Sequence, residues 1–272
     1  DIQFKKGLGQ NLLLDGNINR IMVDAAQLTA DDAVVEVGAG LGALTEHLAA
    51  QAGEVLSVEI DRSFMPCLED RFGGLPHVHL FRGDILNHDL DKLVGEYLAP
   101  RPAYKMLSNL PYYITTPILF HFLESQLHFS RLVIMVQEEV GQRMVAPVGA
   151  EDYGVLSLAC QLYADVDLIH RVPRTCFTPR PKVDSVVVRL RCHEVPATDG
   201  VPPLHVMRII RAAFAQRRKT LRNALARSGA LGVPAEQVSA ALEAAGIAPQ
   251  RRPQTLSLQE YLALAKALPM LS

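Results

Sequence analysis

The chain has 272 residues, 49% of them hydrophobic, which is enough for one large domain or for a domain with an appendage. It has a formal net charge of −2, no apolar run of transmembrane length and no signal peptide at its start, so we expect neither a membrane protein nor a secreted one. The four cysteines form no Cys-x-x-Cys pair, and the close pair His77 and His79 has no third ligand nearby. We therefore expect neither a disulfide framework nor a metal site.

The predicted elements begin with a helix over residues 14–27, whose apolar residues fall on one side. From residue 33 onward, β-branched and apolar runs alternate with helical patterns. The predicted strands cover residues 33–37, 55–60, 78–81, 104–107, 132–136, 166–169 and 186–190. The predicted helices cover residues 42–50, 62–72, 89–97, 116–125 and, in more than one piece, 138–163. This alternation predicts the α/β class, with a mostly parallel, Rossmann-like sheet wrapped by helices.

Residues 193–203 have the composition of a linker, and every later segment has a helical pattern. The charge is uneven along the chain. Residues 1–192 hold 17 Lys+Arg and 24 Asp+Glu, a net of −7, and residues 193–272 hold 10 and 5, a net of +5. The sequence therefore predicts one domain over residues 1–195 and a small all-helical domain over residues 196–272, whose positive charge suits a polyanionic partner.

Unusual residues follow the predicted strands at the edge of the sheet where doubly wound folds bind ligands. Gly38 and Gly40 follow the first strand, and they permit a tight turn and close approach of a ligand to the backbone. Glu59 lies 21 residues after Gly38, at a distance where an acid can accept both hydroxyls of a ribose. Asp84 follows the third strand and can accept the amine of an adenine ring. Together these residues predict a nucleoside site with room for a small charged tail.

A loop over residues 108–114 follows the fourth strand and combines an amide, a proline and two aromatic rings. Asn109 offers a side-chain acceptor, and Pro111 stiffens the loop and presents backbone carbonyls. Tyr112 or Tyr113 offers a face on which a base can stack. This combination suits a site that grips the amino group of a planar ring.

Each of these features also has a plainer interpretation. The spacing Gly38-x-Gly40-x-x-Ala43 fits a nicotinamide-dinucleotide fingerprint as well. Asp84 alone could be a helix N-cap, and Glu59 alone could be a solvated strand end. The occurrence of all four strand-end features in this order favours the nucleoside site.

In the same order, the glycine turn, Glu59, Asp84 and the loop from Asn109 resemble the motifs of class I S-adenosylmethionine-dependent methyltransferases. More narrowly, they resemble those of ribosomal RNA adenine N6,N6-dimethyltransferases, and within that family the bacterial small-subunit enzymes. Three further stretches are similar to the family's N-terminal motif, to the loop before its last strand and to the basic helix of its C-terminal domain. They are residues 5–13, 177–185 and 214–223.

This resemblance implies S-adenosylmethionine as cofactor, a catalytic domain over residues 1–195 and an RNA-recognition domain over residues 196–272. The residues implied to bind the cofactor are Gln10, Asn11, Leu13, Gly38, Gly40, Glu59, Ile60, Asp84, Ile85 and Asn109. The residues implied to act on the target adenine are Asn109, Leu110, Pro111 and Tyr112. The candidate RNA-binding residues are Lys5, Lys6, Arg180, Lys182, Arg217, Arg218, Lys219, Arg222, Arg251 and Arg252. The family usually has Phe where Leu12 stands, which leaves open whether an aromatic ring there shapes the target pocket.

We therefore expect N6,N6-dimethylation of two adjacent adenines near the 3′ end of small-subunit ribosomal RNA, within an immature 30S-type particle, by a cytoplasmic monomer. Three alternatives remain: a large-subunit adenine methyltransferase of the antibiotic-resistance type, a protein-glutamine or DNA-adenine methyltransferase, and a ribosome-assembly factor that acts mainly by binding. The basic run 216–219 favours the small-subunit type. Because the chain begins at Asp1 rather than Met, we also expect residues before it.

Overall fold

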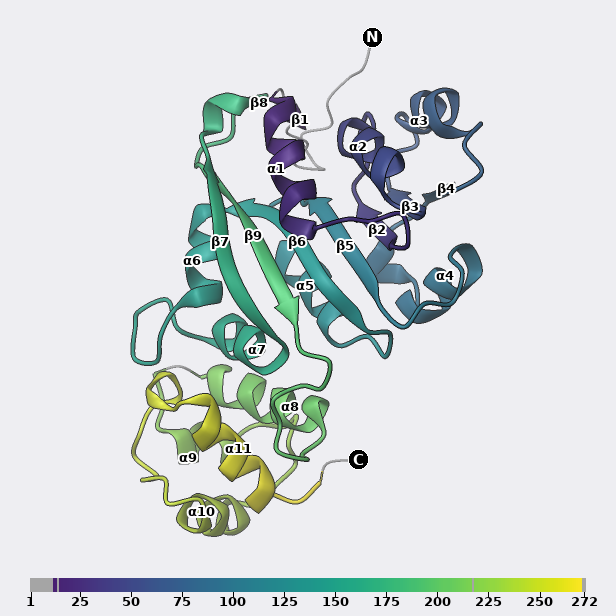
Figure 1. Ribbon diagram of the computed structural model, residues 1–272. Helices are drawn as coiled ribbons and strands as arrows, with labels where there is room; N and C mark the ends of the chain where they lie inside the picture. The colour runs from purple at the N-terminus through teal and green to yellow at the C-terminus, as the bar shows by residue number, and fades with distance from the viewer. Residues whose placement is uncertain (1–11, 14, 217, 271–272) are drawn as a thin grey trace. The chain divides into compact units, whose positions relative to one another are not determined.

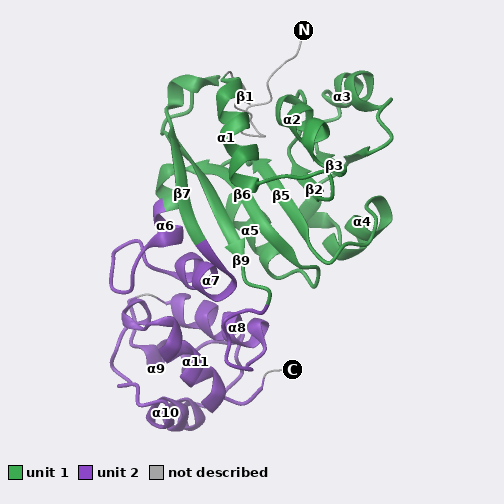
Figure 2. Cartoon of the chain, in the orientation of Figure 1, with its two compact units in different colours: residues 1–141, 166–194 green, residues 142–165, 195–272 purple. Residues whose placement is uncertain are grey.

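Figure 1 shows a computed structural model of the chain, which describes residues 12–13, 15–216 and 218–270. The chain divides into two compact units (Figure 2). The first unit holds residues 1–141 and 166–194, and the second holds residues 142–165 and 195–272. The second unit therefore contains residues 142–165 in addition to the C-terminal residues that the sequence indicates.

A seven-stranded sheet in the order β4-β3-β2-β5-β6-β9-β7 forms the centre of the first unit (Figure 1). Its strands are β2 (Ala33–Val37), β3 (Glu54–Glu59), β4 (Val78–Arg82), β5 (Tyr104–Asn109), β6 (Phe129–Gln137), β7 (Ala164–Val172) and β9 (Ser185–Cys192). All seven predicted strands are present. The pairs from β4 across to β6 are parallel, whereas β9 runs antiparallel to β6. The strand order reverses at β2, between β3 and β5, so the carboxyl end of β2 is the switch point where such sheets bind ligands.

The core of this unit forms where apolar helix faces cover the sheet. Strand β2 is buried along its whole length because it lies between β3 and β5. Helix α1 (Gly16–Ala26) begins at Asp15, whose carboxylate accepts the Asn17 N–H at 2.9 Å. It then packs Ile18 and Met22 against the sheet, in contact with β5, β6 and β9. The other helices of this unit are α2 (Ala43–Gln51), α3 (Met65–Phe72), η2 (Ile85–Asn87), α4 (Leu90–Tyr97), α5 (Thr115–Leu123) and η3 (Arg174–Cys176), and α6 (Glu138–Val145) begins in this unit and ends in the second.

A second, very small sheet joins two distant parts of the chain. Strand β1 (Leu12–Leu13) pairs antiparallel with β8 (Phe177–Thr178), so that Leu13 lies opposite Phe177. Neither strand can be predicted from the sequence, because two residues are too few to show a period. This pairing brings the start of the described chain to the loop that precedes β9.

The second unit is helical, as the sequence predicts. Its helices are α7 (Val155–Tyr163), α8 (Pro203–Phe214), α9 (Leu221–Ala226), α10 (Ala235–Ala244), η4 (Pro253–Thr255) and α11 (Leu258–Ala267). Helix α8 contacts α7, α9 and α11, and its residues Val206, Ile209 and Ile210 are fully buried there. The unit therefore has an aliphatic core of its own.

The structure corrects one expectation from the sequence, namely that residues 214–223 form one basic helix. In the structure α8 ends at Phe214 and α9 begins at Leu221. Thr220 between them has an extended backbone, with φ −65° and ψ 154°, so the two helices are separate. Of the described basic residues, Arg218 and Lys219 lie between the helices and Arg222 lies in α9. Within the described residues, no helix is long and apolar enough to cross a bilayer.

Candidate active site

The glycine turn, residues 38–42, connects β2 to α2. Gly38, Gly40 and Gly42 have φ angles of +79°, +57° and +82°, a region that residues with a Cβ atom rarely adopt. At Gly42 an added Cβ would also lie 2.4 Å from the Phe72 ring. Gly38 is held by its N–H, which donates to Val58 O at 2.8 Å. The sequence therefore needs glycine here to bring the backbone to the switch point.

Arg71 of α3 supports this turn from outside the sheet. One of its guanidinium nitrogens donates to Leu41 O, and the other pairs with Glu46 at 2.7 Å. The guanidinium carbon also lies 4.8 Å from the centre of the Phe72 ring. The turn is thus fixed by a residue that the sequence did not single out.

Glu59 ends β3 and reaches across to the glycine turn. Its two carboxylate oxygens each accept one backbone N–H at 2.7 Å, from Gly40 and from Asp61. The side chain is 4% exposed, and burial raises its pKa above the usual value. The two N–H bonds orient the carboxylate. Because each of its oxygens has a further lone pair, it can still accept ligand hydroxyls.

Glu36 is a second buried acid beside the cavity, and it is not among the site residues that the sequence predicts. One of its oxygens accepts hydrogen bonds from Thr45 Oγ1 and from Ser57 Oγ, both at 2.6 Å. The residue is 1% exposed, and this burial raises its pKa to about 7 despite the two hydroxyl donors. Only its position two residues before the glycine turn could have signalled a role.

Asp84 follows β4 and does cap a helix, as its plainer interpretation proposed. Its carboxylate accepts the Leu86 N–H at 3.0 Å and the Asn87 side-chain amide at 3.1 Å, at the start of η2. It also lines the cavity beside Gly83 and Ile85. The capping bonds orient Asp84 at the cavity wall.

The loop after β5 brings the amide and the aromatic ring to the same cavity. Asn109 is the last residue of β5, and the preceding Ser108 accepts the Val37 N–H at 2.9 Å, which ties the ends of β5 and β2 together. Tyr112 is half-buried and its hydroxyl lies 2.8 Å from Ser185 Oγ. Tyr113 is 56% exposed. The hydrogen bond of Tyr112 fixes its ring, so Tyr112 is the better placed of the two for stacking a base.

One cavity at the carboxyl ends of β2 to β5 unites these parts. The predicted residues that line it are Leu13, Gly38, Gly40, Glu59, Ile60, Asp84, Ile85, Asn109, Leu110, Pro111 and Tyr112. Gln10 and Asn11 lie outside the described residues. Lining residues that the sequence did not nominate include Glu36, the buried Asn19, Phe64 and Phe177. Of these, Phe177 belongs to a stretch that the family resemblance had already marked.

The charges on the cavity wall discriminate between possible ligands. The carboxylates of Glu59 and Asp84 line it, with the buried acid Glu36 behind them, and none of the described lining residues is Lys or Arg. Such a wall suits a nucleoside that carries positive charge, as S-adenosylmethionine does at its sulfonium and ammonium groups. It disfavours the pyrophosphate of a dinucleotide, whose negative charge these carboxylates would repel. The residues present therefore fit S-adenosylmethionine better than a nicotinamide dinucleotide.

The predicted RNA-binding residues are divided between the two units. Arg180 and Lys182 are exposed in the loop before β9 of the first unit. The others that the structure describes belong to the second unit, where Arg218, Lys219, Arg222 and Arg252 are exposed and Arg251 is partly buried. Lys5, Lys6 and Arg217 lie outside the described residues. Whether these residues bind RNA stays a prediction.

Comparison with known proteins places the chain in a family. The sequence profile of the ribosomal RNA adenine dimethylase family matches residues 2–269. The ribosomal RNA small subunit methyltransferase A of Moorella thermoacetica is 46% identical over 97% of this chain and 92% of its own length. The protein of that name from Pelotomaculum thermopropionicum is 47% identical over 96% and 90%.

Solved structures agree with this assignment. A dimethyladenosine transferase from Plasmodium falciparum superposes with a TM-score of 0.76 at 26% identity, covering 93% of this chain and 95% of its own. The 23S rRNA methyltransferase ErmE has a TM-score of 0.64 at 26% identity, covering 94% and 99%. Both the sequence and the architecture therefore show that this chain belongs to the ribosomal RNA adenine dimethylase family.

Proposed function

We propose that this chain transfers methyl groups from S-adenosylmethionine to the N6 atoms of two adjacent adenines near the 3′ end of small-subunit ribosomal RNA. The observation that carries the proposal is that Asn109 to Tyr112 form one wall of the acid-lined cavity. The residues suited to bind an adenine amine therefore lie beside the pocket that suits a cationic nucleoside. The relatives named small subunit methyltransferase A support the choice of RNA.

The side chains have distinct tasks in this proposal. Glu59 accepts the ribose hydroxyls and Asp84 the adenine amine of the cofactor, while the glycine turn borders the methionine end. When bound, S-adenosylmethionine supplies an electrophilic methyl group on sulfur. These assignments use the remaining acceptor capacity of two carboxylates that backbone and side-chain donors already orient.

The target amine is poorly nucleophilic, because its lone pair is delocalised into the ring. The Asn109 side-chain oxygen and a backbone carbonyl near Leu110 accept its two N–H groups and draw the nitrogen towards tetrahedral geometry. The Tyr112 ring stacks on the base, which is worth roughly 1–3 kcal/mol. No strong general base is required, since the amine becomes acidic once it is alkylated. Catalysis then rests on positioning and electrostatics.

The main rival is methylation of large-subunit RNA by the same core. The relatives named for the small subunit are 46% and 47% identical to this chain, whereas ErmE, named for 23S RNA, is 26% identical. The exposed basic residues of the second unit also suit an RNA partner. We propose that the chain acts as a cytoplasmic monomer on an immature 30S-type particle, with a role in its maturation.

Methyl transfer from labelled S-adenosylmethionine tests the proposal directly. Immature small subunits, large subunits and free adenosine are offered in parallel, with Asn109→Ala as the matched control. We expect label only on small-subunit RNA, recovered as N6,N6-dimethyladenine. Label confined to large-subunit RNA would support the rival. Binding to small subunits without any label would point to an assembly factor.

A further inference from the structure

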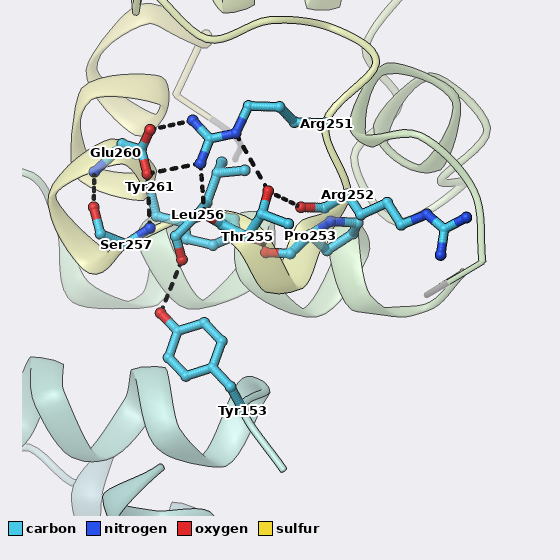
Figure 3. Close-up of polar contacts among 9 residues, drawn as sticks. All are labelled: Tyr153, Arg251, Arg252, Pro253, Thr255, Leu256, Ser257, Glu260 and Tyr261. Carbon is cyan, nitrogen blue, oxygen red and sulfur yellow. Dashed lines mark hydrogen bonds and ion pairs between the residues drawn. The ribbon is translucent and has the colours of Figure 1, made fainter. Parts of the chain in front are cut away.

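The sequence predicts the same role for the adjacent residues Arg251 and Arg252, but in the structure they have different surroundings (Figure 3). The Arg251 guanidinium donates to Thr255 twice, from Nε to the hydroxyl at 3.2 Å and from Nη2 to the backbone carbonyl. It also forms a two-pronged ion pair with Glu260, from Nη1 to Oε1 and from Nη2 to Oε2, the latter at 3.2 Å. Four of the five N–H donors of Arg251 are therefore engaged within the second unit.

The turn that Arg251 clamps, residues 251–257, is held from the opposite side as well. The hydroxyl of Tyr153 donates to Leu256 O at 2.9 Å, and that of Tyr261 donates to Pro253 O at 3.0 Å. Both tyrosines are fully buried. Figure 3 shows the Tyr153 ring on the far side of the turn from the Arg251 guanidinium. The backbone of the turn is thus fixed between buried hydroxyls and one guanidinium.

Glu260 connects this clamp to helix α11. Its carboxylate accepts the Ser257 N–H at 2.8 Å, and its own N–H donates to Ser257 Oγ at 3.3 Å, which is a capping box. The Arg251 guanidinium holds the pKa of the Glu260 carboxyl below its usual value. Because the two charges face each other, the pair adds nothing to the positive charge of the segment.

Arg252 is in the opposite situation. It is exposed, and no hydrogen bond or ion pair of its side chain is found among the described residues. In Figure 3 its side chain points away from the network around Arg251. The turn also adjoins the basic run before α9, because Leu221 N–H donates to Arg251 O at 2.7 Å and Arg222 N–H to Pro249 O at 3.3 Å. Arg252 therefore lies on the same part of the second unit as Arg222.

We propose that Arg251 is a positioning residue which, with Glu260, fixes the turn so that Arg252 is presented to RNA phosphates beside the basic run at residues 218–222. This assigns opposite tasks to two neighbours of the same residue type. A phosphate contact requires free donors and an uncancelled charge, which Arg252 has and Arg251 lacks. The inference rests on the proposed function, since it presumes that the second unit binds ribosomal RNA.

The salt dependence of binding to purified small-subunit ribosomal RNA tests this division. For Arg252→Gln we expect the log–log salt slope to fall by about 0.7–0.9, the loss of one phosphate contact, with no change in the thermal midpoint. For Arg251→Gln and Glu260→Gln we expect the same fall in slope, although the two changes alter the net charge in opposite directions. Adding Arg251→Gln to Arg252→Gln should lower the slope no further.

Arg251→Lys separates position from charge, because a lysine keeps the charge but lacks the planar fork. We expect it to behave like Arg251→Gln. Circular dichroism of each variant checks that the unit remains helical. Arg251 would instead be a direct contact if Glu260→Gln tightened RNA binding, if Arg251→Lys kept the wild-type slope, or if the slope losses of Arg251→Gln and Arg252→Gln added together. Each of these results overturns the inference but leaves the proposed methylation intact, whereas failure of the wild-type chain to bind or methylate the RNA refutes the proposed function itself.

Discussion

Glu36→Gln is expected to remove a pH dependence of stability that the buried acid imposes on the first unit. Glu36 keeps its proton up to about pH 7 in the folded chain, against an ordinary pKa of 4.5. Between these values the folded state binds more protons than the unfolded state, so the free energy of unfolding falls as the pH rises. The loss is complete above the folded pKa. A glutamine of the same shape does not titrate in this range.

The magnitude follows from the interval between the two pKa values. Between pH 4.5 and about pH 7, the free energy of unfolding changes by about 1.4 kcal/mol for each pH unit. The wild type therefore loses roughly 3 kcal/mol of stability that the variant retains. Glu59, whose pKa is also raised, acts in the same direction in both proteins. The difference between wild type and variant therefore reports Glu36 together with its coulombic coupling to Glu59.

Urea unfolding at a series of pH values between 4.5 and 8 measures this difference, and it should be followed by far-ultraviolet circular dichroism because the chain has no tryptophan. Glu69→Gln, at an exposed position on α3, is the control for loss of a carboxylate. Ser57→Ala removes one hydroxyl donor and should move the transition to higher pH. A wild-type-minus-variant difference that is the same at every pH would refute the assignment of a neutral, buried Glu36.

Three further predictions concern the cavity and the sheet. Glu59→Gln should weaken S-adenosylmethionine binding at least roughly tenfold in calorimetry, because a hydrogen bond to a charged group contributes about 1.5–3 kcal/mol, and an unchanged Kd would contradict its role. Asn109→Ala should slow single-turnover methylation by about 10²–10³ while circular dichroism stays the same, by analogy with the loss of one oriented catalytic dipole, and a wild-type rate would exclude the mechanism. Lys105→Met should lower the free energy of unfolding by about 1–3 kcal/mol, since it removes the ammonium that lies 2.7 Å from Asp32 and 2.8 Å from Gln27 O and leaves Asp32 only its Thr29 donors, and a stability within error of wild type would show the pair to be dispensable.

The sequence predicts most of the first unit because parallel strands covered on both faces appear as short, continuous apolar runs. The run 33–37 is such a strand, and β2 has those bounds in the structure. What the sequence does not reveal is how strands pair. The position of β9 between β6 and β7 and the pairing of Leu13 with Phe177 depend on contacts between distant residues, which no local pattern encodes.

Because local patterns do not encode contacts between distant residues, only part of the site could be predicted. Glu59 and Asn109 could be found because each ends a strand with a residue that strands rarely need. Glu36 could not be recognised as a buried acid, because its hydroxyl donors lie nine and 21 residues away and meet it only in the folded sheet. Arg251 and Arg252 are equivalent in sequence, and only their surroundings distinguish them.

The pairing of β1 with β8 has a consequence for biosynthesis. The glycine turn, Glu59 and Asp84 emerge early from the ribosome, but Phe177, which completes the wall beside Leu13, is made almost a hundred residues later. A nascent chain therefore carries the polar groups of the cavity well before the apolar wall that closes it. The wall formed by Leu13 and Phe177 is complete only after β8 has been synthesised and has paired with β1, when the first unit is nearly finished.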